Sequence, residues 1–513
     1  MTDPSGVAEL RVRRGLAEAM GGEEKLARHI AAGKLPVRER IARLCDPDSF
    51  REIGSVSGKA GYDADGVLTD FSPANFIFGR ARIDGRAVVI AADDFTVRGG
   101  AADASITGKV EQAEAMAHTL RLPLIRLIDA TGGSVKTIES LGRTYVPANP
   151  SWGDLIRNLE SVPVVALVLG SVAGIASARA VSAHLTVMVE SISHMFIAGP
   201  PVVKRTGIDM GKEELGGARV HEKAGAADLV VKSEDEAFAT ARAFLSFLPS
   251  SVGEPLPARA ASDPEDRADA DLGAIVPADR RKVYPMRDIL RRVFDDGEVF
   301  EMAPKFGRAS ITALARLGGR PVAVMASDPR VYGGAWGADT CDKAIRFLDF
   351  AETFRLPLVH FVDIPGFMIG PEAERTGTIR HGARALAAVY RASVPVCSIL
   401  VRKCFGVAGA AHMNPEGFRH RYAWPSGDWG SIPLEGGIEA AWKRDLEAAP
   451  DREAMLAEIT ERLDALRSPF RTAEAFGVEE IIDPAETRTL LCEFAELAYR
   501  RNLRDAPQAR YRP

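Results

Sequence analysis

Short apolar runs alternate along the chain with longer segments in which apolar residues recur every three or four positions. RAVVIAAD (86–93), LPLIRLID (122–129) and VPVVALVLG (162–170) are short runs rich in Val, Ile and Leu. Between the first two runs lies ITGKVEQAEAMAHTLR (106–121), whose apolar positions have helical spacing. Short apolar strands that are connected by helices form parallel sheets covered by helices. The pattern therefore predicts an α/β fold.

The same order of segments occurs twice. RLPLIRLIDATGG begins at Arg121 and RLPLVHFVDIPGF begins at Arg355, 234 positions later. A second pair of similar segments begins at Ala81 and Ala315 and has the same separation. A constant offset over so many residues indicates an internal duplication of a whole domain.

The second half repeats the cycle after a segment of linker composition. We expect a helix at 340–355 and strands at 356–363 and 394–401. Residues 250–275 are rich in Pro, Ala, Asp and Arg and poor in large apolar side chains. These features predict an N-terminal domain over residues 1–255 and a C-terminal domain over residues 270–513.

One uncharged segment has to be distinguished from a membrane helix. Residues 161–178 carry no charge and approach the length of a transmembrane helix. Pro163, Gly170 and Gly174 interrupt this segment, and valine is frequent in it. We therefore expect a buried strand, a turn and the start of a helix, without a membrane span.

The composition narrows the class of protein further. The formal net charge is −5, which gives no reason to expect a nucleic-acid partner held by overall charge. The five cysteines are scattered and form no C-x-x-C pair, so we expect reduced, buried thiols rather than a zinc ribbon. The first residues lack the apolar stretch of a signal peptide, and we expect a cytoplasmic protein.

Several catalytic motifs are absent from the sequence. There is no G-x-S-x-G, no H-E-x-x-H and no Walker A loop, so direct ATP chemistry is not expected in this chain. His194 and His221 are candidates for an acid or base, although a structural role is the more frequent one. Asp129 and Asp363 end predicted strands, where a helix cap or a turn anchor is more frequent than a general base.

Glycine turns at the carboxyl ends of predicted strands remain as candidates for chemistry. Ala173-Gly174-Ile175-Ala176 aligns with Phe405-Gly406-Val407-Ala408 in the second half. The N–H groups that begin a following helix can hold an oxyanion without any catalytic side chain, and small residues let a ligand approach. Alternatively, these glycines only permit tight packing, and the residues leave both interpretations open. Gly132-Gly133 and Gly366-Phe367 form a second pair of turns, which are either a pocket rim or plain turns.

Longer motifs carry a resemblance to a known family. Four segments together resemble the carboxyltransferase (β) subunit of biotin-dependent acyl-CoA carboxylases, the propionyl-CoA carboxylase group in particular: GKLPVRERIARLCDPDSF, SHMFIAGPPVVKRTGIDMGKEELGGARVH, FVDIPGFMIG and AWPSGDW. The resemblance implies two tandem crotonase-like domains (ClpP/crotonase superfamily), each with a ββα-spiral core. It also implies a hexamer, with the active site between the N-terminal domain of one subunit and the C-terminal domain of another. The N-terminal half would bind acyl-CoA and the C-terminal half carboxybiotin.

The resemblance further implies a mechanism without a side-chain base. Carboxybiotin would supply CO2, the freed biotin nitrogen would take a proton from the α-carbon of the acyl-CoA, and the enolate would attack the CO2. Two oxyanions then need two holes, which a duplicated fold supplies. The N–H groups of Gly174 and Ile175 would hold the thioester oxygen, and those of Val407 and Ala408 the biotin oxygen.

The other site residues and partners are implied in the same way. The acyl-CoA side would include Ala173, Ala176, Gly132, Gly133, Gly409 and Ala410, with Arg98, Lys136 and Arg143 as candidate cations for the CoA phosphates. Each of these cations could equally be a solvated surface charge. The biotin side would include Gly366, Phe367 and Gly406. No metal is expected. The sequence has no Met-Lys-Met biotinylation motif, so biotin would come on a separate biotin carboxylase/biotin carboxyl carrier α subunit.

The chain departs from the family pattern at both turns. Ile175 and Val407 stand where the family usually has glycine, and Gly409-Ala410 where it usually has Tyr-Asp. A β-branched residue excludes positive φ, so each hole persists only if these residues have ordinary dihedral angles. Loss of a ring and a charge predicts a larger, more apolar pocket. We therefore expect a branched, longer or aromatic acyl-CoA rather than simply propionyl-CoA.

Three alternatives to an acyl-CoA carboxylase remain. One is the carboxyltransferase subunit of a biotin-dependent acyl-CoA decarboxylase, and another is a non-catalytic carboxylase paralogue. The third is a biotin-independent crotonase-type enzyme that hydrolyses or isomerises acyl-CoA, which requires an acid or base in the cleft.

Overall fold

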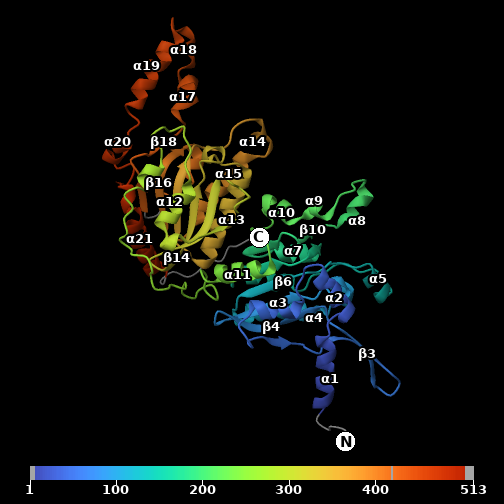
Figure 1. Cartoon of the computed structure of the whole chain (residues 1–513). Coiled ribbons are helices and arrows are strands. Elements are labelled where there is room, and N and C mark those ends of the chain that lie inside the picture. Colours follow the sequence, from blue (N-terminus) through green and yellow to red (C-terminus); the bar gives the residue numbers. More distant parts are fainter. Residues whose placement is uncertain (1–5, 417–419, 503–513) are drawn as a thin grey trace. The chain divides into compact units, whose positions relative to one another are not determined.

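The computed structural model describes residues 6–416 and 420–502, which form two compact units divided between Glu254 and Pro255. We call them unit 1 (6–254) and unit 2 (255–416 and 420–502). In each unit, helices cover a mixed sheet (Figure 1). The α/β fold predicted from the alternating pattern is therefore confirmed.

Unit 1 contains a seven-stranded sheet of order β1-β4-β5-β6-β7-β9-β11. The strands are β1 (Arg51–Ile53), β4 (Phe76–Ile83), β5 (Arg86–Asp93), β6 (Leu124–Ile128), β7 (Val164–Val168), β9 (Leu185–Val189) and β11 (Leu229–Val231). Pairing is antiparallel from β1 to β5 and parallel from β5 to β11. The three strands expected in this half are β5, β6 and β7. Every residue of β6, β7 and β9 is buried, because helices cover both faces of these parallel strands.

Unit 2 repeats this topology in the order β12-β13-β14-β15-β16-β17-β19, with β18 beside the end of β16. The strands are β12 (Val299–Met302), β13 (Ser310–Leu317), β14 (Arg320–Ser327), β15 (Leu358–Ile364), β16 (Val396–Phe405), β17 (His420–Ala423), β18 (Asp428–Gly430) and β19 (Glu480–Ile481). Strand directions also match those of unit 1. In unit 1, β8 (Ser171–Ala173) pairs with β10 (His194–Phe196) as β16 pairs with β18. The equal order and directions support the internal duplication.

The helices follow the strands in the same alternating way. Those of unit 1 are α1 (Val7–Glu18), α2 (Glu23–Ala31), α3 (Val37–Leu44), α4 (Thr107–Leu120), α5 (Lys136–Leu141), α6 (Trp152–Leu159), α7 (Ile175–Val181), α8 (Pro200–Val203), α9 (Lys212–Gly216), α10 (Ala218–Ala224) and α11 (Glu234–Leu245). Those of unit 2 are α12 (Met286–Val293), α13 (Ala338–Phe354), α14 (Pro371–Arg375), α15 (Thr378–Arg391), α16 (Gly406–Ala410), α17 (Leu434–Ala441), α18 (Lys443–Ala448), α19 (Arg452–Asp464), α20 (Pro469–Glu474) and α21 (Thr487–Asn502). The two predicted helices are α4 and α13. Short 3-10 turns at η1 (Arg98–Gly100) and η6 (Tyr332–Gly334) occupy equivalent places after β5 and β14.

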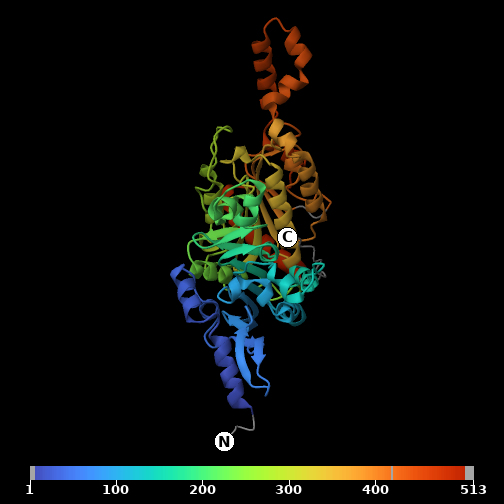
Figure 2. The ribbon, with the colours of Figure 1, turned by 90° about the vertical axis from the view of Figure 1, so that its right-hand side faces the viewer.

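Each unit also carries a part that extends beyond its sheet (Figure 1, Figure 2). In unit 1, α1 lies beside the hairpin of β2 (Gly58–Tyr62) and β3 (Leu68–Pro73), and Arg13 donates to the Tyr62 hydroxyl. In unit 2, α17, α18 and α19 form an arm around a small core of Ile438, Leu446 and Ile459.

The uncharged segment 161–178 forms β7, β8 and the first half of α7, as expected from its glycines. Within the described ranges, no helix has the length and apolar character needed to span a membrane.

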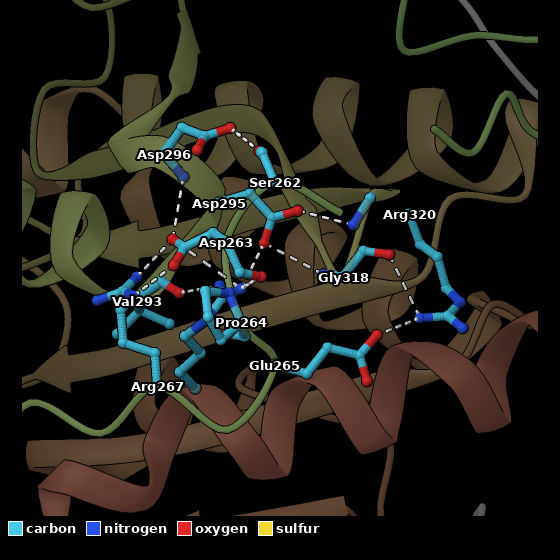
Figure 3. Close-up of polar contacts among 12 residues, drawn as sticks. Ser262, Asp263, Pro264, Glu265, Arg267, Val293, Asp295, Asp296, Gly318 and Arg320 are labelled. Carbon is cyan, nitrogen blue, oxygen red and sulfur yellow. Dashed lines mark hydrogen bonds and ion pairs between the residues drawn. The ribbon is translucent and has the colours of Figure 1, made fainter. Parts of the chain in front are cut away.

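The segment with linker composition is anchored to unit 2 (Figure 3). Arg488, whose side chain is 2% exposed, donates to the carbonyls of Asp263, Pro264 and Val293 and lies 2.8 Å from Asp295. Glu265 pairs with Arg320 at 3.1 Å. Residues 256–269 were placed between the two predicted domains because of their linker composition. That composition gives no sign of the anchoring, because Arg488 lies more than 200 positions later.

Candidate active site

In unit 1 the two predicted glycine turns lie side by side. Gly132 follows β6, and a Cβ added to it would stand 2.4 Å from the Ala173 carbonyl oxygen and 3.8 Å from the Ile175 nitrogen. Its own carbonyl accepts from the Ala102 N–H at 2.9 Å, which ties the turn to the loop between β5 and α4. Only glycine allows this approach, because Gly132 has φ 77°. The structure thus brings together Gly132, Ala173 and Ile175, three residues expected at the acyl-CoA site.

The backbone at Gly174 resolves the question raised by Ile175. Gly174 takes the positive φ of 59°, and Ile175 is the first residue of α7 with no positive φ. The β-branched side chain is therefore accommodated without strain.

The donors of this turn differ from the expected pair. The Gly174 N–H donates to the Phe196 carbonyl at 3.1 Å, because parallel pairing of β8 with β10 carries Phe196 to this position. Among the described residues, the N–H groups of Ile175 and Ala176 have no backbone acceptor, as at any helix start. The N–H groups of Ile175 and Ala176 are therefore the nearest candidate donors after Gly174.

A strongly cationic cavity of about 680 Å³ opens beside these turns. Its basic lining residues are Lys25, Arg28, Lys34, Arg98 and Lys136, with Phe95, Thr96, Gly99, Ala101 and Ser134 among the others. Among the residues whose side chains the structure describes, the lining includes no carboxylate. From outside the lining, Glu24 pairs with Arg28 at 2.6 Å and Asp129 pairs with Lys34 at 3.0 Å. The volume suits a small-molecule site, and the excess of basic side chains suits an anion. Arg98 and Lys136 were expected here, whereas Arg143 does not line the cavity.

Sequence reasoning missed three of these cations. Lys25 and Arg28 lie one helical turn apart on α2, which was not predicted as part of the site. Lys34 contacts Asp129 at 3.0 Å and lies 4.6 Å above the Phe95 ring. The only sequence signal was the three-residue spacing of Lys25 and Arg28, which many surface helices share.

Asp129 and Asp363 act as buried anchors at the ends of equivalent strands. Asp129 is fully buried and pairs with Lys34 and Arg40. Asp363 accepts from Tyr284 and Arg402, and from the Lys403 N–H at 3.0 Å. Burial raises the pKa of Asp363, and Arg402 opposes that shift. Both residues therefore hold turns in place, the role that their strand-end positions favoured.

The turns of unit 2 mirror those of unit 1. β15 and β16 pair Ile364 with Cys404, so the turns at Gly366 and Gly406 begin at neighbouring places. Gly406 has φ 61° and Gly366 φ 132°, and a Cβ added to Gly366 would meet nothing within 4 Å. The Gly366 carbonyl accepts from the Trp336 N–H at 3.1 Å.

The helix that begins at Gly406 keeps the expected donors in helical geometry. Val407 and Ala408 lie in the first turn of α16 and have no positive φ. The Val407 side chain is 50% exposed. Phe367 turns its ring toward α15, where a Cβ on Gly382 would stand 2.2 Å from it. An open, glycine-lined turn with helix-start donors remains for a planar polar group.

Gly409 itself opens little space, because backbone lies close to it. Gly409 is buried, and a Cβ there would lie 2.7 Å from the Cys404 carbonyl carbon, so backbone fills the place of a missing ring. Ala410 is exposed. His412 was a candidate lining residue; it is half-buried, its ring Nδ1 lies 2.7 Å from the Gly409 carbonyl, and desolvation lowers its pKa to about 4. Met413 and Asn414 line a cavity of about 410 Å³ at the amino end of β16, away from the turn.

The two candidate histidines have different surroundings. His221 contacts the Met195 carbonyl through Nε2 at 2.6 Å, which is a structural contact. His194 lies between Ser171, 2.9 Å from Nδ1, and Glu213, 2.7 Å from Nε2.

Comparisons with known proteins agree with this arrangement. The carboxyl transferase domain family matches residues 28–512. The chain is 33% identical over 504 residues to the propionyl-CoA carboxylase carboxyltransferase subunit of Haloferax mediterranei, covering 96% of this chain and 95% of that one. It is 31% identical over 495 residues to the methylmalonyl-CoA decarboxylase subunit alpha of Veillonella parvula, covering 95% and 94%.

A solved structure shows the same fold over the whole chain. Transcarboxylase 12S, described as a hexamer with methylmalonyl-coenzyme A and methylmalonic acid bound, aligns with a TM-score of 0.88 at 32% identity, covering 100% of this chain and 98% of that one. The fold is thus the expected duplicated, crotonase-like α/β fold. By sequence and by fold, this chain belongs to the carboxyltransferases of biotin-dependent acyl-CoA carboxylases.

Proposed function

We propose that this chain transfers a carboxyl group from carboxybiotin to the α-carbon of an acyl-CoA, with acyl-CoA bound by unit 1 and carboxybiotin by unit 2. The observation that carries the proposal is the cationic cavity next to the Gly132 and Gly174 turns. Unit 1 and unit 2 share equivalent turns, but the five-cation cavity described above is lined by unit 1 residues alone. This difference favours unit 1 for the phosphate-bearing substrate.

CoA carries phosphates at one end and a thioester at the other. Lys25, Arg28, Arg98 and Lys136 would pair with the phosphates, since ammonium and guanidinium groups form charge-assisted hydrogen bonds with phosphate oxygens. Gly132 packs against the Ile175 turn, and the cavity residues Ser134 and Lys136 follow Gly132 within four positions of the chain. The thioester of a CoA bound in the cavity would therefore reach the Ile175 turn.

The chemistry proposed for the chain is electrostatic. The N–H of Ile175, and that of Ala176 in place of Gly174, would hold the thioester oxygen as it gains negative charge, which lowers the energy of the enolate. In unit 2, the N–H groups of Val407 and Ala408 would hold the biotin oxygen, with Gly366, Phe367 and Gly406 around the ring. Carboxybiotin, when bound, supplies the carboxyl group and the base that takes the α-proton. No side chain of this chain is then needed as a base.

The partner and the assembly follow from the same proposal. Biotin would arrive on a separate biotin carboxylase/biotin carboxyl carrier α subunit. We propose a homohexamer, as described for the 12S structure.

The acyl group is proposed to be larger than propionyl. The support is limited to Ala410, which is small and exposed. Gly409 gives no support, because backbone occupies the space beside it.

The test is a carboxylation assay with the cognate biotinylated α subunit, ATP, labelled bicarbonate and acyl-CoAs of graded size. We expect label in an acyl-CoA larger than propionyl-CoA. Lys136→Glu should raise KM for acyl-CoA, whereas Gly406→Val should lower kcat without changing acyl-CoA affinity, because φ 61° excludes valine. The same KM change in both variants would contradict the division of labour between units.

The direction of transfer is tested separately. Carboxylated acyl-CoA and the uncarboxylated carrier are mixed, and carboxyl transfer to the carrier is measured. Transfer from acyl-CoA to the carrier, without transfer from carboxybiotin to acyl-CoA, would identify the chain as a decarboxylase subunit instead of a carboxylase subunit. No transfer in either direction, despite a stable complex with the α subunit, would favour a non-catalytic paralogue.

A further inference from the structure

Three polar side chains outside the proposed carboxyl-transfer machinery form a continuous hydrogen-bonded chain in unit 1. Ser171 Oγ lies 2.9 Å from His194 Nδ1, and His194 Nε2 lies 2.7 Å from Glu213 Oε1. The His194 side chain is 12% exposed and that of Glu213 is 66% exposed. Serine, imidazole and carboxylate in this order are the parts of an activated nucleophile.

The fold itself holds the serine and the histidine together. β8 and β10 pair in parallel with Ser171 opposite His194, so their contact does not depend on a mobile loop. The imidazole also stacks on Phe196, with ring centroids 6.0 Å apart and planes at 7°. A backbone bridge between His194 and Gly217 holds β10 beside the end of α9, the helix that carries Glu213.

The carboxylate determines which tautomer the imidazole adopts. An ionised Glu213 can only accept, so Nε2 must carry the hydrogen. In the neutral ring Nδ1 is then an acceptor, and the Ser171 hydroxyl donates to it. This tautomer is the one that can remove a proton from the serine as it attacks.

The duplicated unit shows that the fold does not require this chain of bonds. In unit 2 the strand pair β16–β18 takes the place of β8–β10, with Lys403 opposite Asp428. Asp428 pairs there with Arg467 at 2.8 Å. The same turn thus forms with different residues, so serine and histidine at these positions are a property of unit 1 and not of the topology.

We propose that Ser171 is the nucleophile of a second activity, the biotin-independent hydrolysis of acyl thioesters, with His194 as its base and Glu213 as a positioning residue. Ser171 Oγ bonds to the thioester carbonyl carbon while His194 Nδ1 takes the hydroxyl proton. The carbon–sulfur bond breaks, and the thiolate leaves with that proton. Water then attacks the acyl-serine, gives a proton to His194, and releases the carboxylic acid as Ser171 regains its hydrogen.

The class of substrate rests on the proposed function, because acyl-CoA is the thioester that unit 1 would bind. Ser171 lies two positions before Ala173 on β8, and the Ala173 backbone carbonyl faces the Gly132 turn. An acyl-CoA at that turn would therefore place its thioester near the strand that carries Ser171.

The test uses the full chain without α subunit, ATP or biotin. Reaction with a fluorophosphonate is followed by peptide mass spectrometry, and hydrolysis of p-nitrophenyl acetate and of propionyl-CoA is followed by product release. Neither the fluorophosphonate nor the nitrophenyl ester needs CoA recognition, so these readings do not depend on the proposed carboxyl transfer. We expect one phosphonate on Ser171, and loss of hydrolysis by about 100-fold or more in Ser171→Ala and His194→Gln.

Control variants separate chemistry from structure. Ser177→Ala is the matched control, since Ser177 lies on the following helix and donates to the Phe196 carbonyl. It should react like the unaltered chain. Glu213→Gln should slow phosphonylation about tenfold at an unchanged unfolding temperature, because it affects orientation and not packing. Carboxylation with the α subunit should stay within about twofold in Ser171→Ala, as that transfer does not use the hydroxyl.

The outcomes decide between the activity and a structural contact. Absence of a phosphonate on Ser171, or equal hydrolysis in Ser171→Ala, would overturn the nucleophile. Phosphonylation and ester hydrolysis without release of CoA would overturn the thioester as substrate. Release of CoA that disappears in Ser171→Ala, even from a chain inactive in carboxylation, would establish the second activity.

Discussion

Replacement of Gly132 by alanine tests whether close approach of the two turns of unit 1 sets the position of the Ile175 donor. Gly132 has φ 77°, and an added Cβ would stand 2.4 Å from the Ala173 carbonyl oxygen. Real Cβ contacts are not shorter than 3.0 Å, so Ala173 or the Gly132 turn must move by 0.6 Å or more. Ala173 precedes Gly174 and Ile175 directly, so the donor moves with it.

Two effects add in this variant. A left-handed backbone costs a non-glycine residue about 1–2 kcal/mol. Overpacking against a backbone oxygen adds about 1–3 kcal/mol. For catalysis, a donor misplaced by close to 1 Å lowers the rate by roughly 100-fold.

Gly85→Ala is the matched control. Gly85 lies in the turn between β4 and β5 with φ 79°, and a Cβ there would meet nothing within 4 Å. It should show only the backbone cost of about 1–2 kcal/mol and full carboxylation.

The assay compares kcat and the unfolding temperature of both variants with the unaltered chain, using the biotinylated α subunit and labelled bicarbonate. We expect Gly132→Ala to unfold at a lower temperature than Gly85→Ala and to lose most of its kcat. A folded Gly132→Ala protein that carboxylates like the Gly85→Ala protein would refute the reasoning.

Three further predictions concern charge. Lys136→Glu should raise KM for acyl-CoA about tenfold at low salt and less at high salt, because screening weakens the loss of a phosphate contact; steady-state kinetics at two ionic strengths measure this. Burial lowers the pKa of both His360 and His412 to about 4, so the folded state stays neutral while the unfolded chain gains protons below pH 6.5. Stability is therefore complete above pH 6.5 and falls by up to about 3 kcal/mol per histidine toward pH 4; urea unfolding should show a shallower fall in His360→Asn. Glu114→Gln should lower the free energy of unfolding by about 3–5 kcal/mol, because the fully buried Arg126 loses the carboxylate that lies 2.9 Å away. Changing both residues to apolar ones should recover most of that loss in the same urea unfolding experiment.

Local patterns predicted the elements but not their partners. The strands, the helices α4 and α13 and the repeat follow from periodicity and offset, which are properties of short windows. The charge of Arg126 inside a buried strand is explained only by Glu114 on α4, and that of Asp129 only by Lys34 and Arg40. Such pairs depend on how segments that are distant in the sequence meet in the fold, and a short stretch of sequence does not contain this information.

The site was predictable to the same extent. Gly132, Ala173 and Ile175 were candidates because they lie in glycine turns after predicted strands, and their assignment to the acyl-CoA site came from the family resemblance. Lys25 and Arg28 were missed because α2 joins the cavity from a segment without strand or glycine signals. The larger pocket was predicted from a missing ring and a missing charge at Gly409-Ala410, and nothing in the sequence indicated that backbone lies close to Gly409.

The anchored segment before α12 has a practical consequence for cutting the chain into fragments. A C-terminal fragment that begins at residue 270 would remove the Asp263 and Pro264 carbonyls, which accept from the almost fully buried Arg488. Its guanidinium would lose two of its acceptors at once, in a place that water scarcely reaches. A cut directly after Glu254 keeps all of these bonds. The composition of this segment suggests an easy target for trypsin. Arg259 and Arg267 should nevertheless resist cleavage, because hydrogen bonds hold both side chains within unit 2.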